Sequence, residues 1–239
     1  MSRLVLLSGW GCDARIWQPL AAHWPDRLET GFEVTPPDWP GYATRPALDD
    51  PEDLTALAEA MAADLPQDAV WVGWSLGGLL AAALLDHLPA PRGLVLLGMG
   101  ARFCHPDGVS HENLATFRSA FRRDPPATRA HFLRWQLRGE PSPRTAHRQL
   151  LELLGPEPTA SSATLAAGLG QLAEIDNSAR LAAPPCPVWR IVGEQDPLLP
   201  PSVHDAADVR LADAGHCPML SQPLALAECL AAIAEERTP

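Results

Sequence analysis

Lysine is absent from this sequence of 239 residues, and all 18 basic residues are arginines. Long apolar runs are absent too, because none approaches the roughly 18 residues that a membrane-spanning helix needs. The apolar segment at residues 4–7 is too short for a secretory signal. The five cysteines form an odd set without C-x-x-C spacing, so neither a disulfide framework nor a zinc site is predicted. We therefore expect a cytoplasmic protein that begins at Met1 and holds no metal.

The composition that remains is that of an ordinary globular protein. Apolar residues make up 46% and charged residues 20% of the chain, which allows a large core and excludes disorder and collagen-like repeats. The length predicts one large domain or a core with an insertion. A net charge of −11 repels nucleic acid and anionic membrane surfaces, so we expect neither as a partner.

Short apolar runs alternate with helix-length amphipathic stretches near both ends of the chain. This alternation predicts parallel strands joined by crossover helices. The expected strands are residues 4–7, 32–34, 69–72, 94–97, 188–192 and 209–211. The expected helices are one from Asp50, as N-cap, through Pro51 to about Leu65, one at 78–88 and a closing helix at 223–235.

The middle of the chain, residues 103–182, shows helical periodicity without a convincing strand. We interpret it as a helical lid inserted into an α/β core that comprises residues 1–102 and 183–239. Nine of the arginines lie within residues 102–148 beside four acidic residues, which gives this segment a net charge of +5. Because the whole chain carries −11, the remainder carries −16. The segment therefore forms a chemically different surface.

A Gly-Trp-Ser-Leu-Gly motif at residues 73–77 lies between a predicted buried strand and a predicted helix. A serine on such a strained turn projects its hydroxyl, and glycines on both sides avoid clashes with the neighbouring backbone. The N-terminus of the following helix presents free N–H groups and its dipole to developing negative charge. Ser75 is therefore the candidate nucleophile. The alternative is a buried serine at a glycine-rich helix start.

A serine nucleophile needs a histidine base and an orienting carboxylate, which are expected in the order Ser, Asp, His. Asp196 follows the fifth predicted strand and His216 follows the sixth, at the sheet edge where parallel strands build their sites. Glu194 and Asp213 are competing carboxylates. We prefer Asp196 because the residue before a proline is held extended, whereas Asp213 is too close in sequence to His216. The remaining alternative is that Asp196 and His216 belong to ordinary loops.

The loop Ser-Gly-Trp-Gly at residues 8–11 follows the first predicted strand. A glycine-containing loop at this place directs the backbone N–H of Trp10 at the same oxyanion that the N–H of Leu76 reaches. Trp10 and Leu76 are therefore the candidate oxyanion hole. The alternative is a turn that ends the strand, with the Trp10 side chain in the core.

Taken together, Gly-Trp-Gly after the first strand, Gly-Trp-Ser-Leu-Gly-Gly, Asp-Pro at 196–197 and Gly-His-Cys-Pro at 215–218 resemble an α/β-hydrolase. Within that superfamily the chain is most similar to the pimeloyl-[acyl-carrier protein] methyl ester esterases of biotin synthesis. The resemblance implies an α/β-hydrolase fold, with a mostly parallel sheet flanked by helices and an inserted helical lid. Ser8 stands where that family usually has histidine.

The resemblance also implies roles for residues of the lid. Residues 132–136, Phe-Leu-Arg-Trp-Gln, resemble the segment with which the family lines its acyl pocket. The implied substrate-binding residues are Trp10, Leu76, Phe132, Leu133 and Gln136. Arg144 and Arg148 match the spacing of two lid arginines that contact the carrier protein, and Arg129 lies near the positions of two more. A solubilising role for these arginines is the alternative.

We therefore predict a serine esterase that needs no cofactor and acts as a monomer. Ser75 attacks the methyl ester of pimeloyl-[acyl-carrier protein], methanol leaves, and water hydrolyses the acyl-enzyme. One alternative is a carboxylesterase of broad specificity for short-chain esters without a carrier protein. Others are a non-hydrolytic receptor for small molecules, and a lyase or cofactor-free peroxidase on the same scaffold.

Overall fold

The computed structural model describes residues 2–25 and 32–235. The predicted core also includes residues 1, 26–31 and 236–239, which lie outside the described residues. Six described strands form one sheet in the order β2-β1-β3-β4-β5-β6, and every neighbouring pair is parallel. The strands are β1 (Ser2–Leu7), β2 (Phe32–Thr35), β3 (Val70–Trp74), β4 (Gly93–Leu97), β5 (Val188–Gly193) and β6 (Val209–Leu211).

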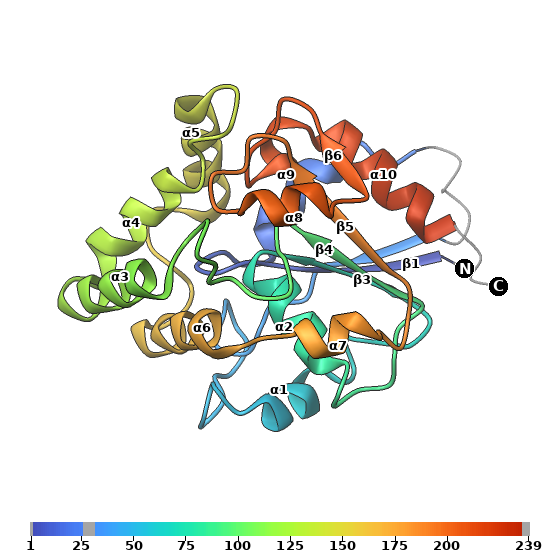
Figure 1. The fold of residues 1–239 in the computed structure, drawn as a ribbon, viewed down its shortest axis with the longest axis horizontal. Coiled ribbons are helices and arrows are strands. Elements are labelled where there is room, and N and C mark those ends of the chain that lie inside the picture. The colour runs from blue at the N-terminus through green and yellow to red at the C-terminus, as the bar shows by residue number, and fades with distance from the viewer. Residues whose placement is uncertain (1, 26–31, 236–239) are drawn as a thin grey trace.

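Helices cover both faces of the sheet (Figure 1). One face is covered by α1 (Leu54–Met61), α2 (Leu76–Leu84) and α7 (Ser178–Ala182), and the other by the 3₁₀-helix η1 (Ala14–Leu20), α9 (Pro218–Ser221) and α10 (Pro223–Glu235). Strands β3 and β4 are buried along their whole length, because a parallel sheet with two covered faces needs continuous apolar runs. A short helix, α8 (Pro201–Asp205), links β5 to β6.

The residues between β4 and β5 are mostly helical, as the periodicity predicts. Helices α3 (His111–Arg123), α4 (Pro125–Trp135), α5 (Pro143–Leu154) and α6 (Ser162–Glu174) extend beyond the carboxyl ends of the strands in Figure 1, whereas α7, at the end of this stretch, packs against α2 on the sheet. The two ends of this insertion meet, since Arg102 and Asp176 form an isolated antiparallel β-bridge and the Asn177 amide donates to the Ala101 carbonyl at 2.8 Å. No helix in residues 2–25 and 32–235 has the length and hydrophobicity to cross a membrane.

All six predicted strands and the closing helix at 223–235 are present, but the starts of the other two predicted helices are corrected. Helix α1 begins at Leu54 and is capped by Asp53, whose carboxylate accepts from the amides of Thr55 at 2.8 Å and Ala56 at 3.2 Å. Asp50 closes the preceding turn instead, because it accepts from the Glu52 amide at 3.0 Å. The second helix begins at Leu76 rather than Gly78, directly after the motif serine.

Candidate active site

Ser75 occupies a strained turn between β3 and α2. Its φ of 55° and ψ of −126° lie in a region that side chains with a Cβ rarely adopt. A Cβ at Gly73 would lie 2.4 Å from the Gly78 Cα, and one at Gly77 would lie 2.5 Å from the Leu7 carbonyl oxygen. The flanking glycines therefore have a steric cause, because only a hydrogen fits between the turn and the neighbouring backbone.

Asp196 and His216 form a buried pair at the carboxyl ends of β5 and β6. The His216 Nδ1 lies 2.7 Å from the Asp196 Oδ2, and both side chains are almost fully excluded from solvent. The other carboxylate oxygen of Asp196 accepts from the Leu198 amide at 2.9 Å. The pair rests on Gly98 at the end of β4, where a Cβ would lie 3.2 Å from Nδ1. Asp196 can thus hold the imidazole in one orientation and stabilise its protonated form.

The backbone of His216 is tied to the residue that precedes Ser75. The indole Nε1 of Trp74 donates to the His216 carbonyl at 2.7 Å, and the two rings lie 5.5 Å apart. The His216 Nε2 is buried and has no hydrogen-bond partner within residues 2–25 and 32–235. The Ser75 hydroxyl therefore makes no hydrogen bond to this nitrogen, and proton transfer from Ser75 to His216 stays a prediction.

The loop that follows β1 lies against Ser75. A Cβ at Gly9 would come within 2.9 Å of the Ser75 Cβ, so the close approach requires glycine. In the described part of the chain, the Trp10 amide has no backbone hydrogen-bond acceptor. The Leu76 amide opens helix α2, where the first N–H groups have no partner within the helix. The two predicted oxyanion donors are therefore free to bind a ligand oxygen.

Tyr42 and Arg129 hold this loop from both sides, which the sequence did not reveal. The Gly11 amide donates to the Tyr42 hydroxyl at 3.2 Å, and the Arg129 guanidinium donates to the Gly11 carbonyl at 3.1 Å. Arg129 also donates to the Pro156 carbonyl at 3.2 Å and is only 4% exposed. The structure thus corrects the predicted docking role of Arg129, because a buried guanidinium that supports the loop cannot meet a partner at the surface.

The side chain of Trp10 joins the loop to the helices of the insertion. Its Nε1 donates to the Leu165 carbonyl at 2.8 Å, and its ring packs edge-to-face on Phe117, Phe121 and Phe132 with centroids 5.0 to 5.9 Å apart. These helices also enclose an apolar cavity of about 430 Å³. Its walls include Phe103, Leu114, Phe117, Phe132, Trp135 and Leu169. Phe117 and Phe132 contact Trp10 and also line the cavity, so the aromatic cluster joins the oxyanion loop to this apolar space.

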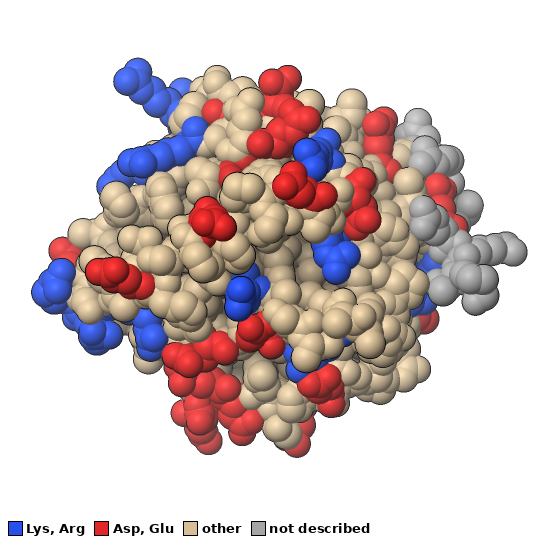
Figure 2. Space-filling view, viewed as in Figure 1, with Lys and Arg blue, Asp and Glu red and all other residues tan. Residues whose placement is uncertain are grey.

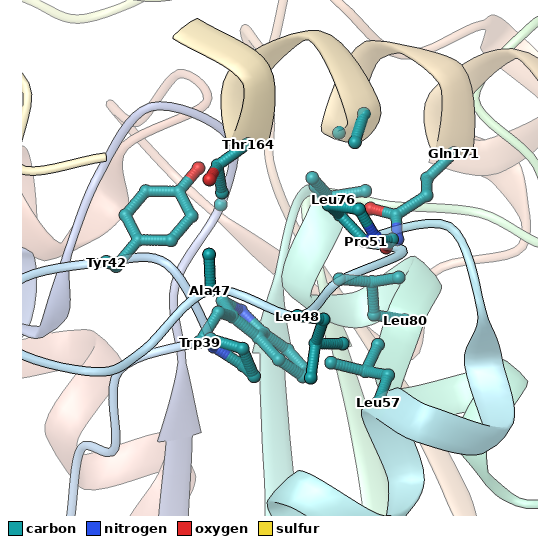
Figure 3. Close-up of a pocket in the computed structure, with 14 residues that line it drawn as sticks. Trp39, Tyr42, Ala47, Leu48, Pro51, Leu57, Leu76, Leu80, Thr164 and Gln171 are labelled. Atoms are coloured by element: carbon teal, nitrogen blue, oxygen red, sulfur yellow. The ribbon is translucent and has the colours of Figure 1, made fainter. Parts of the chain in front are cut away.

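The other predicted substrate residues are distributed differently. Leu133 and Gln136 are buried on the side of α4 that does not line the large cavity. Leu76 lines a smaller cavity of about 40 Å³ between α2, α6 and the loop that carries Trp39 and Tyr42 (Figure 3). The Gln136 Nε2 is buried without a partner among the described residues. Contact with substrate remains a prediction for Leu133 and Gln136.

Glu140 is another residue near the site that the sequence analysis did not single out. Its carboxylate is buried and accepts hydrogen bonds from Gly215 and Cys217, the two neighbours of His216. Its contacts lie more than seventy positions away in the chain, so no local motif predicts them. Within residues 2–25 and 32–235, no group of His, Cys, Asp and Glu side chains has the arrangement of a metal site.

Comparison with known proteins identifies the family. The model of the alpha/beta hydrolase family matches residues 4–229, and the chain belongs to this family. Pimeloyl-[acyl-carrier protein] methyl ester esterases are among its relatives. The one from Edwardsiella ictaluri is 33% identical over 98% of this chain and 94% of its own length. The one from Aromatoleum aromaticum is 34% identical over 92% of this chain and 93% of its own length.

Solved structures confirm the predicted fold. The esterase EaEST from Exiguobacterium antarcticum superposes with a TM-score of 0.81 over 99% of this chain and 92% of its own, at 19% identity. A thermophilic esterase from Thermogutta terrifontis gives a TM-score of 0.76 over 98% and 89%, at 24% identity. At these identities the likeness concerns the fold: a parallel sheet with helices on both faces.

Proposed function

We propose that this protein is a serine esterase that hydrolyses the methyl ester of pimeloyl-[acyl-carrier protein] and releases methanol in biotin synthesis. The buried Asp196–His216 pair, whose backbone is bound by the Trp74 indole next to Ser75 and whose Nε2 has no partner among the described residues, is the observation that carries the hydrolytic part. The names of the full-length relatives support the substrate, because they are methyl ester esterases of this kind at 33–34% identity. The receptor, lyase and peroxidase alternatives are not favoured.

The proposed reaction uses the side chains in two half-reactions. The Ser75 Oγ attacks the ester carbonyl while His216 Nε2 takes the hydroxyl proton, and the amides of Trp10 and Leu76 bind the oxyanion. The tetrahedral intermediate collapses, and His216 gives its proton to the departing methoxy group, which leaves as methanol. A water molecule, deprotonated by His216, then attacks the acyl-enzyme. The second tetrahedral intermediate, formed by this attack, collapses, releases the carboxylate product and returns the proton from His216 to Ser75.

The proposed division of labour places catalysis in a core of residues 1–102 and 183–239 and substrate binding in a lid of residues 103–182. The methyl ester lies at one end of the pimeloyl chain and the carrier thioester at the other, so the methylenes must extend from Ser75 towards the surface. The apolar cavity among α3, α4 and α6 supports this arrangement, because burial of each methylene contributes about 0.8 kcal/mol.

We also propose that Arg144 and Arg148 of α5 contact the acidic carrier protein and its phosphopantetheine arm. Both side chains are exposed, and Arg148 is only loosely paired with Glu152 at 3.9 Å. Figure 2 shows basic side chains gathered over the insertion, while acidic side chains predominate over much of the remaining visible face. This distribution follows the net charges of +5 for residues 102–148 and −16 for the rest.

The docking proposal is tested by the double charge reversal Arg144→Glu/Arg148→Glu. We expect KM for the carrier-bound ester to rise by an order of magnitude or more, while KM for p-nitrophenyl butyrate is unchanged. The matched control is Arg190→Glu/Arg210→Glu, which changes net charge equally on β5 and β6, away from the insertion. Equal effects of the two double variants, or equal effects on both substrates, would remove the docking proposal.

The proposed function is tested with purified protein and in cells. The wild type is expected to hydrolyse p-nitrophenyl acetate, and Ser75→Ala is expected to lose this activity. The wild-type gene, and not the Ser75→Ala gene, should rescue a biotin auxotroph that lacks the esterase. Turnover of p-nitrophenyl acetate without rescue would instead favour the broad-specificity carboxylesterase, and absence of both would favour the receptor.

A further inference from the structure

A single carboxylate holds both residues that flank His216. Glu140, in the segment between α4 and α5, is only 4% exposed. Its Oε1 accepts from the Cys217 amide at 2.7 Å, and its Oε2 accepts from the Gly215 amide at 3.1 Å. The carboxylate thus spans the peptide segment that carries the histidine and engages one N–H on each side of it.

The segment that carries Glu140 is packed tightly against both loops of the Asp196–His216 pair. A Cβ at Gly139 would lie 1.8 Å from the carbonyl oxygen of Gln195, which is the residue before Asp196. A Cβ at Gly215 would lie 2.7 Å from the Gly139 carbonyl carbon. These separations leave room only for hydrogens, so the three backbones are in direct contact.

We infer that Glu140 is a positioning residue for the base of the esterase reaction, an inference that rests on the proposed function. Buried carboxylates are costly unless hydrogen bonds satisfy them, and here both oxygens have an amide partner. With the Trp74 indole on the His216 carbonyl, the backbone of the histidine is held from two directions. Held in this way by the insertion and by Trp74 of the core, the imidazole keeps its bond to Asp196 and, in the proposed reaction, its alignment with Ser75.

The substitution Glu140→Gln tests this role with almost no change in shape. The amide keeps one oxygen acceptor, but its NH₂ group opposes one of the two backbone N–H groups. A misplacement of about 1 Å at a reacting group costs on the order of 100-fold in rate. We therefore expect kcat for p-nitrophenyl butyrate to fall by on the order of 100-fold with little change in KM. Glu140→Asp, which keeps the charge on a shorter arm, should recover part of kcat.

Active sites are counted by end-point labelling with a fluorophosphonate probe, so that kcat is expressed per labelled site, and Tm is measured in parallel. Glu157→Gln is the matched control, since it removes the same charge from an exposed position of the insertion, and it should match the wild type. An unchanged kcat per site in Glu140→Gln, whatever its Tm, would overturn the inference. If Glu140→Gln does not fold, Glu140→Asp carries the same test, and wild-type kcat per site in it would overturn the inference.

Ser75→Ala separates this inference from the proposed function. Loss of hydrolysis in Ser75→Ala together with wild-type kcat per site in Glu140→Gln refutes only the positioning role. Full hydrolysis in Ser75→Ala would refute the proposed function and, with it, the reason to count Glu140 as part of the catalytic apparatus.

Discussion

The strained turn at Ser75 makes a quantitative prediction about stability. A residue with a Cβ at φ 55° and ψ −126° costs about 1–3 kcal/mol, which glycine avoids. Glycine also makes the unfolded chain more flexible, which costs about 0.4–1 kcal/mol. Ser75→Gly is therefore expected to be more stable than Ser75→Ala by about 1 kcal/mol, or about 2–4 °C in Tm for a chain of this size. Both variants lose the nucleophile and should be inactive.

The comparison of glycine with alanine cancels the loss of the hydroxyl, because both variants lack it. The matched control is Ser119 in α3, an ordinary helical position, where glycine should be less stable than alanine by about 1 kcal/mol. Thermal and urea unfolding of the four variants measure both differences. A Ser75→Gly variant that is less stable than Ser75→Ala, while the control behaves as expected, would show that the turn at Ser75 is not strained.

Three further outcomes are expected. Gly77→Ala should abolish folding or activity, as judged by circular dichroism and hydrolysis, because its Cβ would lie 2.5 Å from the Leu7 carbonyl oxygen. Arg129→Met should lower kcat equally for p-nitrophenyl and carrier-bound esters, because the Gly11 carbonyl loses its donor; an effect on the carrier-bound ester alone would restore a docking role. Burial raises the pKa of the Cys12 thiol to about 12, so iodoacetamide at pH 8 should label it only after unfolding, as read by peptide mass spectrometry.

Much of the fold follows from local patterns in the sequence. The inner strands β1, β3 and β4 lie on apolar runs, because both faces of the sheet are covered there, whereas the edge strands β2 and β6 are only partly buried and each include a charged residue. The start of the helix near residue 50 could not be predicted as well, since Asp50 and Asp53 are both suitable N-cap residues. The turn between them determines that the helix begins after Asp53. The predicted family was confirmed by the relatives, and the order of motif residues was the signal.

Contacts between distant segments were beyond the reach of these patterns. Arg129 lies in a basic segment, and composition alone favoured a surface position; its burial depends on two carbonyls, one of them 118 residues away. Glu140 was likewise one acid among many arginines, and its role appears only when the insertion is folded against the His216 loop. The candidate catalytic residues could be named from the sequence because their motifs are local, and their roles stay predictions; the groups that hold them could not be named.

The closed base of the insertion has a consequence for how such enzymes change. Because Ala101 and Asn177 are hydrogen-bonded where the chain leaves and rejoins the core, the intervening segment resembles a cassette whose replacement need not disturb the sheet. Exchange of this cassette between relatives offers a direct route to new substrates. A successful exchange must also deliver an acceptor for the amides of Gly215 and Cys217, and a chimaera that lacks one is expected to bind its new ester yet turn it over slowly.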